Sequence, residues 1–162
     1  MKNMLCALAV SVLLSPSLAF ADGGTSCAAA QEIFSGQTYS GDTSTSTSFI
    51  GSFSGVPSPG PDLAFKFTDH NSAGNIVVTI TNGWNAGGVI TASCAAVSGP
   101  PLSAGTGTTT FNVSVDRPPL TDGTQYFFIM TGNPSDNSGP SGPFSFTTPA
   151  VLPVTLQSFS ID

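Results

Sequence analysis

Residues 63–81, LAFKFTDHNSAGNIVVTIT, contain two runs in which apolar and polar side chains alternate. The run at 63–68 has a leucine and two phenylalanines on one phase, and the run at 75–80 has two isoleucines and a valine on one phase. Phe111, Val113 and Val115 repeat the pattern farther along the chain. Because successive side chains of a β-strand point to opposite faces, each run predicts a strand with one buried face.

The remaining chain also favours strands, and no stretch of ten or more residues has apolar side chains at helical spacing. Residues 125–130 are apolar on both phases, which is typical of a central strand covered on both faces. Two polar stretches, 40–48 and 132–143, are predicted to be long surface loops. The chain is therefore predicted to be all-β, with about eight short strands in two packed antiparallel sheets. Weaker strand patterns lie at 31–34, 47–53, 88–93 and 143–147.

Residues 1–21 have the composition of a secretory signal peptide. Lys2 precedes an apolar run, Pro16 breaks that run, and Ala19-Phe-Ala21 offers a small-x-small cleavage site. We expect this leader to be a helix outside the sandwich that is removed on export. The apolar run is shorter than the roughly 20 residues a membrane helix needs. The product is thus predicted to be soluble and secreted or displayed at the cell surface, with the periplasm as an alternative.

The charge balance is acidic. Three basic side chains stand against nine acidic ones, and removal of Lys2 would leave only Lys66 and Arg117. Nucleic acid and anionic membranes are poor partners for this balance, because phosphate binding depends on clustered Lys and Arg. Charged residues make up 7% of the chain, against about 25% in ordinary domains. Ser, Thr, Asn and Gly are left to form the surface, as in extracellular β-proteins.

Three cysteines are present, and Cys6 would leave with the leader. Cys27 and Cys94 remain, and two cysteines in an oxidising compartment predict one disulfide. A metal site is the competing interpretation, but two cysteines and one histidine lack the CxxC spacing of such sites.

Several segments within residues 26–131 share a pattern with a known family. They are Ser26-Cys-Ala-Ala-Ala30 with Gly36 and Thr38, Pro61-Asp-Leu-Ala-Phe-Lys-Phe-Thr68, the strand pattern at 76–80, Cys94, and Leu120-Thr-Asp-Gly-Thr-Gln-Tyr-Phe-Phe128. Together they resemble the bacterial pre-peptidase C-terminal (PPC) domain, a secreted β-sandwich often attached to exported proteases. The resemblance implies a jelly-roll-like sandwich, but a role beside a linked enzyme is not carried over because no catalytic domain accompanies these segments. In the Leu-x-x-Gly-x-x-Tyr segment, Gly123 would supply a turn and the Tyr126 hydroxyl would need a buried partner.

Catalytic chemistry finds little support in the sequence. His70 is the only histidine and lies in a polar turn, and no G-x-S-x-G elbow supplies a nucleophile. Most acidic residues fall in turn sequences, where Asp caps its own backbone, so a carboxylate pair for glycoside hydrolysis is not indicated. We therefore expect the protein not to be an enzyme, with a small secreted hydrolase as the weakest alternative.

Two binding chemistries remain open. Hard cations take clustered carboxylates, and Asp62, Asp69 and Asp122 at predicted strand ends are weak candidates for a structural calcium, although no D-x-D-x-D loop occurs. No other cofactor is expected. Trp84, flanked by Asn82 and Asn85, would suit sugar stacking, but a tryptophan of this kind more often caps a sandwich core.

The predicted organisation is a signal peptide at 1–21, a β-sandwich domain at 22–150 and an edge strand or tail at 151–162. In the tail, Val154 and Leu156 share one phase, and Pro153 limits the segment to an edge or a strand start. We expect a monomer with this tail docked on its own sheet, and donor-strand assembly as the alternative. The predicted function is a non-enzymatic exported module that binds an unknown protein or glycan, with a carbohydrate-binding module using Trp84 as the runner-up.

Overall fold

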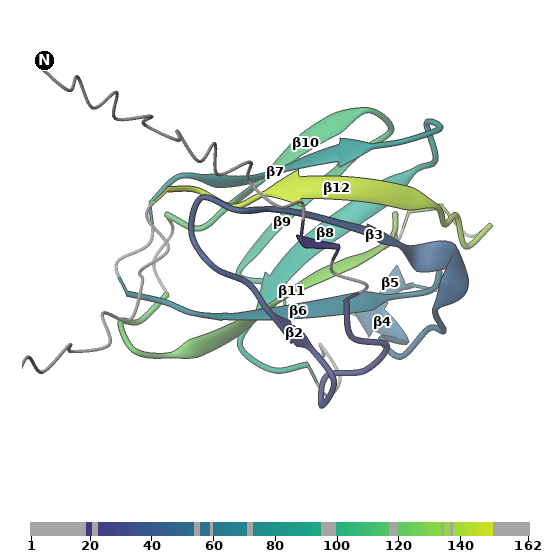
Figure 1. Cartoon of the computed structure of the whole chain (residues 1–162). Helices are drawn as coiled ribbons and strands as arrows, with labels where there is room; N and C mark the ends of the chain where they lie inside the picture. The colour runs from purple at the N-terminus through teal and green to yellow at the C-terminus, as the bar shows by residue number, and fades with distance from the viewer. Residues whose placement is uncertain are drawn as a thin grey trace, which may run out of the picture.

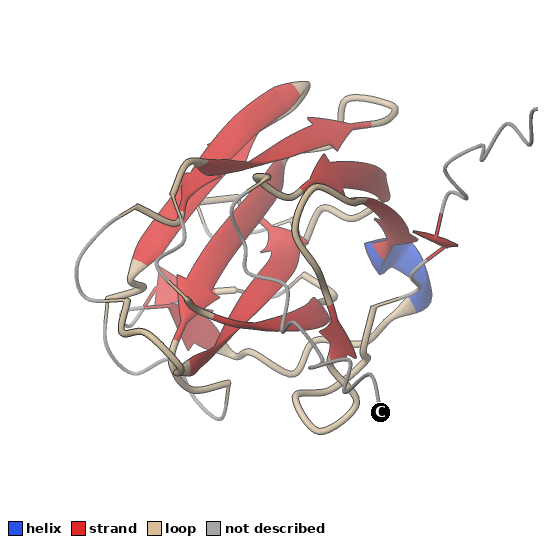
Figure 2. Ribbon diagram, turned by 60° about the vertical axis from the view of Figure 1, so that its left-hand side comes forward, coloured by secondary structure: helices blue, strands red, loops and turns tan. Residues whose placement is uncertain are grey.

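The structure is a computed structural model that describes residues 19–20, 23–53, 56–58, 60–70, 73–94, 100–116, 120–133, 135–136 and 138–150. Two sheets lie face to face with the core between them, as the prediction of an all-β sandwich requires (Figures 1 and 2). Of the leader helix predicted at 1–21, residues 1–18 and 21 lie outside the described residues, as does the tail at 151–162. The helix prediction is wrong at residues 19–20, which form a short strand, β1, paired with β3 of the sandwich. Within the described part of the chain, no helix is long and apolar enough to cross a membrane.

Each sheet contains five strands. In spatial order, sheet I consists of β1 (Ala19–Phe20), β3 (Thr38–Asp42), β12 (Pro143–Thr147), β7 (Asn75–Ile80) and β10 (Thr110–Ser114). Sheet II consists of β2 (Gln31–Glu32), β6 (Leu63–Thr68), β11 (Gln125–Gly132), β8 (Ala86–Thr91) and β9 (Ser103–Gly107). A small hairpin of β4 (Ser52–Phe53) and β5 (Val56–Pro57) and one 3-10 turn, η1 (Thr43–Thr45), complete the described elements.

The order of the longer strands is that of a jelly roll. Without the two-residue strands β1 and β2, sheet I reads β3-β12-β7-β10 and sheet II reads β6-β11-β8-β9. All pairs among these eight strands are antiparallel. The first of the eight pairs with the last and the second pairs with the seventh, as in a double Greek key, and successive strands alternate between the sheets except at the β8–β9 pair.

The predicted alternation is confirmed in the core. Leu63, Phe65 and Phe67 of β6 point between the sheets, and β7 alternates exposed and buried residues along its whole length. Phe65 is the centre of an aromatic cluster, with the ring centroids of Phe146 and Phe144 4.8 Å and 6.2 Å away, both in edge-to-face geometry. Edge-to-face contacts of this kind add to the free energy gained from burying the rings.

Sheet II is covered on its outer face as well. Ile129 of β11, Ala64 of β6 and Val89 of β8 form a second buried cluster with Ile50 and Cys94. β11 is the central strand of its sheet and is covered on both faces, which explains, as predicted, why both of its phases are apolar. The loop before β6 and the segment that carries Cys27 lie over this face.

The predicted disulfide is present. Cys27 and Cys94 are joined, with their Cα atoms 5.5 Å apart. Cys94 belongs to the second cluster and the partly buried Cys27 packs against it, so the bond fixes the N-terminal segment against the outer face of sheet II.

Two tyrosines anchor the two sheets in the same way. The Tyr126 hydroxyl accepts a hydrogen bond from Thr121 N at 2.8 Å, and the Tyr39 hydroxyl accepts one from Phe34 N at 2.7 Å. A glycine with positive φ lies three residues before each tyrosine, at Gly36 (65°) and Gly123 (74°). The Leu-x-x-Gly-x-x-Tyr pattern is therefore matched by Ile33-x-x-Gly36-x-x-Tyr39 at the start of β3. Burial of the Tyr39 ring also raises the pKa of its hydroxyl.

One loop prediction needs correction. Residues 40–48 are not a single surface loop, because 40–42 complete β3 and 43–45 form η1. The cause lies at Gly41, which faces the core where a Cβ would lie 2.9 Å from Cζ of Phe144. A large ring on β12 takes the space of the missing side chain, so the alternation that marks a strand is absent from the sequence of β3. The other predicted loop, 132–143, begins with the last residue of β11 and ends with the first of β12, and its described residues between them contain no strand.

Candidate functional site

The outer face of sheet I has no described element over it, in contrast to that of sheet II. Its outward side chains alternate with buried ones such as Ile76, Val78 and Val113. The strand register arranges them in two rows of four across β3, β12, β7 and β10, followed by a pair on β7 and β10. We call this surface the hydroxyl–amide face; it consists of Thr38, Thr147, Val77, Asn112 in one row, Ser40, Ser145, Thr79, Thr110 in the next, and the pair Asn75, Ser114.

The hydroxyl–amide face carries no charged side chain among these ten residues, and nine of them end in a hydroxyl or an amide. Thr38 Oγ1 and Thr147 Oγ1 lie 3.0 Å apart, so neighbouring hydroxyls are within hydrogen-bonding distance. Hydroxyls and amides both donate and accept hydrogen bonds. With strands about 4.8 Å apart, four strands span roughly 14 Å. The face therefore offers many neutral hydrogen-bonding groups on one side of a four-stranded sheet.

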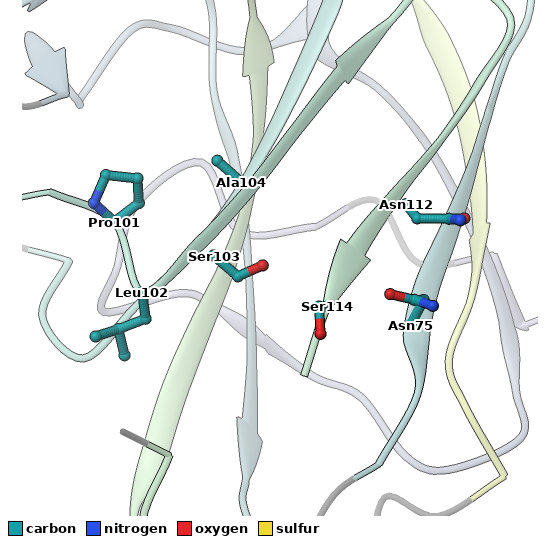
Figure 3. Close-up of a pocket in the computed structure, with 7 residues that line it drawn as sticks. All are labelled: Asn75, Pro101, Leu102, Ser103, Ala104, Asn112 and Ser114. Carbon is teal, nitrogen blue, oxygen red and sulfur yellow. The ribbon is translucent and has the colours of Figure 1, made fainter. Parts of the chain in front are cut away.

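An open pocket of about 290 Å³ adjoins this face at the β10 edge (Figure 3). Its wall is polar on the sheet I side. On the other side, formed by residues 101–104 before and at the start of β9, it is partly apolar. A Cβ at Gly105 would lie 2.3 Å from the Asn112 carbonyl oxygen, so only glycine lets β9 approach β10 this closely. The lining residues are Asn75, Pro101, Leu102, Ser103, Ala104, Asn112 and Ser114.

One of the two large hydrophobic residues that are exposed in the described chain lies on this face. Val77 is 42% exposed in the first row, whereas Phe34, which is 53% exposed, precedes β3 and donates its N–H to the Tyr39 hydroxyl. A single exposed apolar side chain is ordinary on a protein surface. Val77 gives the first row one apolar contact among its polar neighbours.

Trp84 is placed as a core residue. It is half-buried and packs against the main core, and its indole Nε1 donates to the Pro143 carbonyl at 2.9 Å. A Cβ at Gly142 would lie 2.6 Å from the indole ring, so the chain covers part of that ring. The indole is thus largely engaged by the protein itself, which fits the capping role that the sequence favoured.

The two asparagines beside Trp84 have different surroundings. Asn82 is exposed in a turn with a φ of 66°. Asn85 is half-buried and donates to Asp136 Oδ2, while its Oδ1 accepts from Asn133 Nδ2. The Ser138 hydroxyl and backbone N–H donate to the Asp136 carboxylate and hold its pKa below the ordinary value. Asn85 therefore belongs to a loop-stabilising network rather than to a platform with Trp84.

Only two of the three calcium candidates lie near one another. Asp62 precedes β6, whereas Asp69 follows that strand, so six strand residues, or roughly 20 Å, separate them. Asp122 lies in the turn near Asp69, since Gly123 N donates to the Asp69 carbonyl. Among the described residues, no group of three or more His, Cys, Asp or Glu side chains could hold a metal ion.

Asp62 is the most buried acidic residue of the described chain, with no exposed surface. Its Oδ2 accepts hydrogen bonds from Phe49 N and Ile50 N, both at 2.8 Å. Burial raises the pKa of Asp62, while the Thr131 hydroxyl and the two backbone N–H groups act in the opposite direction. Thr131 is nevertheless outside hydrogen-bonding geometry to Oδ1, which has no partner. The carboxylate therefore fixes the loop that covers sheet II.

His70 lies in an exposed turn, as the sequence predicts. Its Nδ1 is 3.1 Å from Asp122 Oδ1, and the two side chains are 39% and 61% exposed. A polar contact with this exposure contributes little to stability.

The sequence analysis did not single out the hydroxyl–amide face. A signal was present, because the polar phases of the runs at 75–80 and 110–114 hold Asn, Thr and Ser but no charged residue. No known protein family matches the chain, and no curated protein or solved structure is significantly similar to it.

Proposed function

We propose that the protein is a non-enzymatic, exported β-sandwich that binds a neutral glycan on the hydroxyl–amide face. The observation that carries the proposal is the contrast between the two sheets. The outer face of sheet II is closed by a buried apolar cluster, whereas that of sheet I presents neutral hydrogen-bonding groups over four strands.

A glycan fits the chemistry of this face better than a charged partner does. Sugar hydroxyls donate and accept hydrogen bonds, as do the side chains of Asn75 and Asn112. Sugar rings also have apolar C–H surfaces, which Val77 would contact. The formal net charge of −6 disfavours anionic polymers.

Export is supported by the leader pattern at 1–21, by the disulfide and by the sparse charge of the surface. The resemblance to bacterial PPC domains favours the same setting, at the cell surface or in the extracellular space.

Retention on insoluble neutral polysaccharides tests the proposal. We expect secreted protein to bind at least one of cellulose, chitin, or an insoluble α-glucan. The double variant Asn75→Ala, Asn112→Ala should weaken binding by about tenfold or more, since each lost hydrogen bond is worth about 1 kcal/mol. Asn82→Gly is the matched control, because glycine tolerates the positive φ at that exposed turn and the turn lies at the other end of β7.

Two results would contradict the proposal. Absence of binding to every neutral polysaccharide, together with capture of a purified protein partner through the same face, would assign the face to protein recognition. Binding that Asn82→Gly abolishes and the double variant leaves unchanged would return the site to the Trp84 end of the sandwich.

A further inference from the structure

The N-terminal end of the described chain bridges the two sheets. Residues 19–20 pair with β3 at the edge of sheet I, with Ala19 beside Tyr39 and Phe20 beside Ser40. Gly24 pairs instead with Ala64 of β6 in sheet II, through two hydrogen bonds of 2.8 Å. The predicted cleavage after Ala21 falls between these two attachments. Cleavage would leave Gly24 attached to β6 and would separate β1 from the chain.

Loss of β1 would expose the edge of β3. The Gln37 carbonyl accepts a hydrogen bond from Thr148 N, and Thr43 N donates one to the Gly142 carbonyl. The backbone N–H and C=O groups of alternate residues from 37 to 43 therefore point toward β12. The residues between them therefore direct their N–H and C=O groups toward the side that β1 occupies. These residues are Thr38, Ser40 and Asp42; the Asp42 carbonyl already accepts a hydrogen bond from Thr45 Oγ1. An exposed row of this kind is a template for another strand.

The C-terminal end of the described chain lies beside the start of this edge. Gly36 N donates to the Pro149 carbonyl and Ser35 Oγ donates to the Ala150 carbonyl, both at 3.0 Å. The turn at 35–36 immediately precedes β3. A segment that leaves Ala150 and follows β3 would run parallel to it, which is the direction of β1.

We propose that removal of the leader frees the β3 edge and that residues 151–162 of the same chain take the place of β1. Twelve extended residues reach about 40 Å, whereas the five residues of β3 span about 17 Å. Pro153 stands near the start of the segment, where a strand tolerates proline. The short connection gives the segment of the same chain a higher effective concentration than that of a second copy. This inference rests on the export step of the proposed function.

Hydrogen exchange of the Ser40 amide, measured by NMR on protein secreted with its own leader, tests the inference. We expect this amide to be protected, with Thr43 as the internal reference because its bond to Gly142 is independent of the edge. In the variant Val154→Asp, Leu156→Asp, Ser40 exchange should accelerate by about 100-fold or more while Thr43 is unchanged. The matched control Thr155→Asp, Gln157→Asp adds the same charge on the opposite phase and should keep Ser40 protected.

The failure of this inference is distinguishable from that of the proposed function. Intact mass, measured first, shows whether residues 1–21 were removed; if they are retained, the export step fails, and with it the inference. Rapid exchange of Ser40 in correctly processed monomer overturns the inference alone. Protection that depends on protein concentration, in oligomers that disappear when residues 151–162 are deleted, would assign the edge to a second copy and also overturn it. None of these results alters the glycan-binding test.

Discussion

Replacement of Asp62 by alanine tests how the covered face of sheet II is held. The carboxylate is fully buried, and Oδ2 accepts the N–H groups of Phe49 and Ile50. Alanine would leave the buried Ile50 N–H without a partner, at a cost of about 1–3 kcal/mol, and the part-buried Phe49 N–H at a smaller cost. Part of this loss is offset, because the variant also lacks the desolvation penalty of the buried carboxylate. We therefore expect Asp62→Ala to lower the free energy of unfolding by about 2–4 kcal/mol.

Urea unfolding at equilibrium, with the disulfide intact, measures this loss. Asp42→Ala is the matched control, since Asp42 Oδ1 also accepts a backbone N–H, that of Ser44, but in an exposed turn. That variant should lose only about 0.5–1 kcal/mol. A loss below about 0.5 kcal/mol in Asp62→Ala would refute the assignment of Asp62 as the residue that fixes this loop.

The pH dependence of Asp62→Asn provides a second check. Because burial raises the pKa of Asp62 above its value in the unfolded chain, the native state binds the proton more tightly. The contribution of this group to stability is full below the unfolded pKa of about 4 and declines as the pH rises through the native pKa. The asparagine variant lacks this decline, so its destabilisation relative to the parent should shrink between pH 4 and pH 7. A destabilisation that grows over this range would contradict the raised pKa.

Three further predictions concern the fold. The free energy of unfolding in urea should fall by roughly 2–5 kcal/mol in the double variant Cys27→Ala, Cys94→Ala. If only one of the two single variants is destabilised, the cause is lost packing of that side chain and not loss of the disulfide. Tyr39→Phe and Tyr126→Phe should each cost about 1–2 kcal/mol, because Phe34 N and Thr121 N lose their acceptors; equal stability of Tyr126→Phe and the parent would contradict the anchoring role. Gly105→Ala should lower the melting temperature by several degrees through its clash with the Asn112 carbonyl, whereas Gly123→Ala, which meets no atom within 4 Å, tests the effect of positive φ alone.

The strands that sequence reasoning found are those with large side chains on the buried phase. β6, β7 and β10 fill the core with their own Phe, Ile and Val, so their alternation is visible in the sequence. β3 and β9 place glycines on that phase. Gly41 lies under the Phe144 ring and Gly107 lies under Phe111. In both places a ring from another strand fills the space above a glycine. The strand that carries the glycine therefore lacks the alternation of large apolar and polar residues by which a strand is recognised in a sequence.

The candidate site was less accessible from sequence for a related reason. Each row of the hydroxyl–amide face takes one residue from each of β3, β12, β7 and β10, which are far apart in the chain. Register, and not composition, makes them neighbours. The disulfide could be predicted because only two cysteines remain after the leader. Counting cysteines requires no knowledge of how the strands pair.

The two sheets differ in what a substitution on the outer face would disturb. The disulfide, Asp62 and Ile50 act on the outer face of sheet II, where substitutions remove buried contacts. Asn75, Thr79 and Asn112 are exposed and project from sheet I, where no described side chain depends on them for burial. Substitutions on the hydroxyl–amide face should therefore change stability by less than about 0.5 kcal/mol. A variant of this face that loses polysaccharide binding and keeps its free energy of unfolding identifies a recognition surface. Measuring the Asn75→Ala, Asn112→Ala variant by polysaccharide retention and by urea unfolding therefore distinguishes a binding face from a merely solvated one.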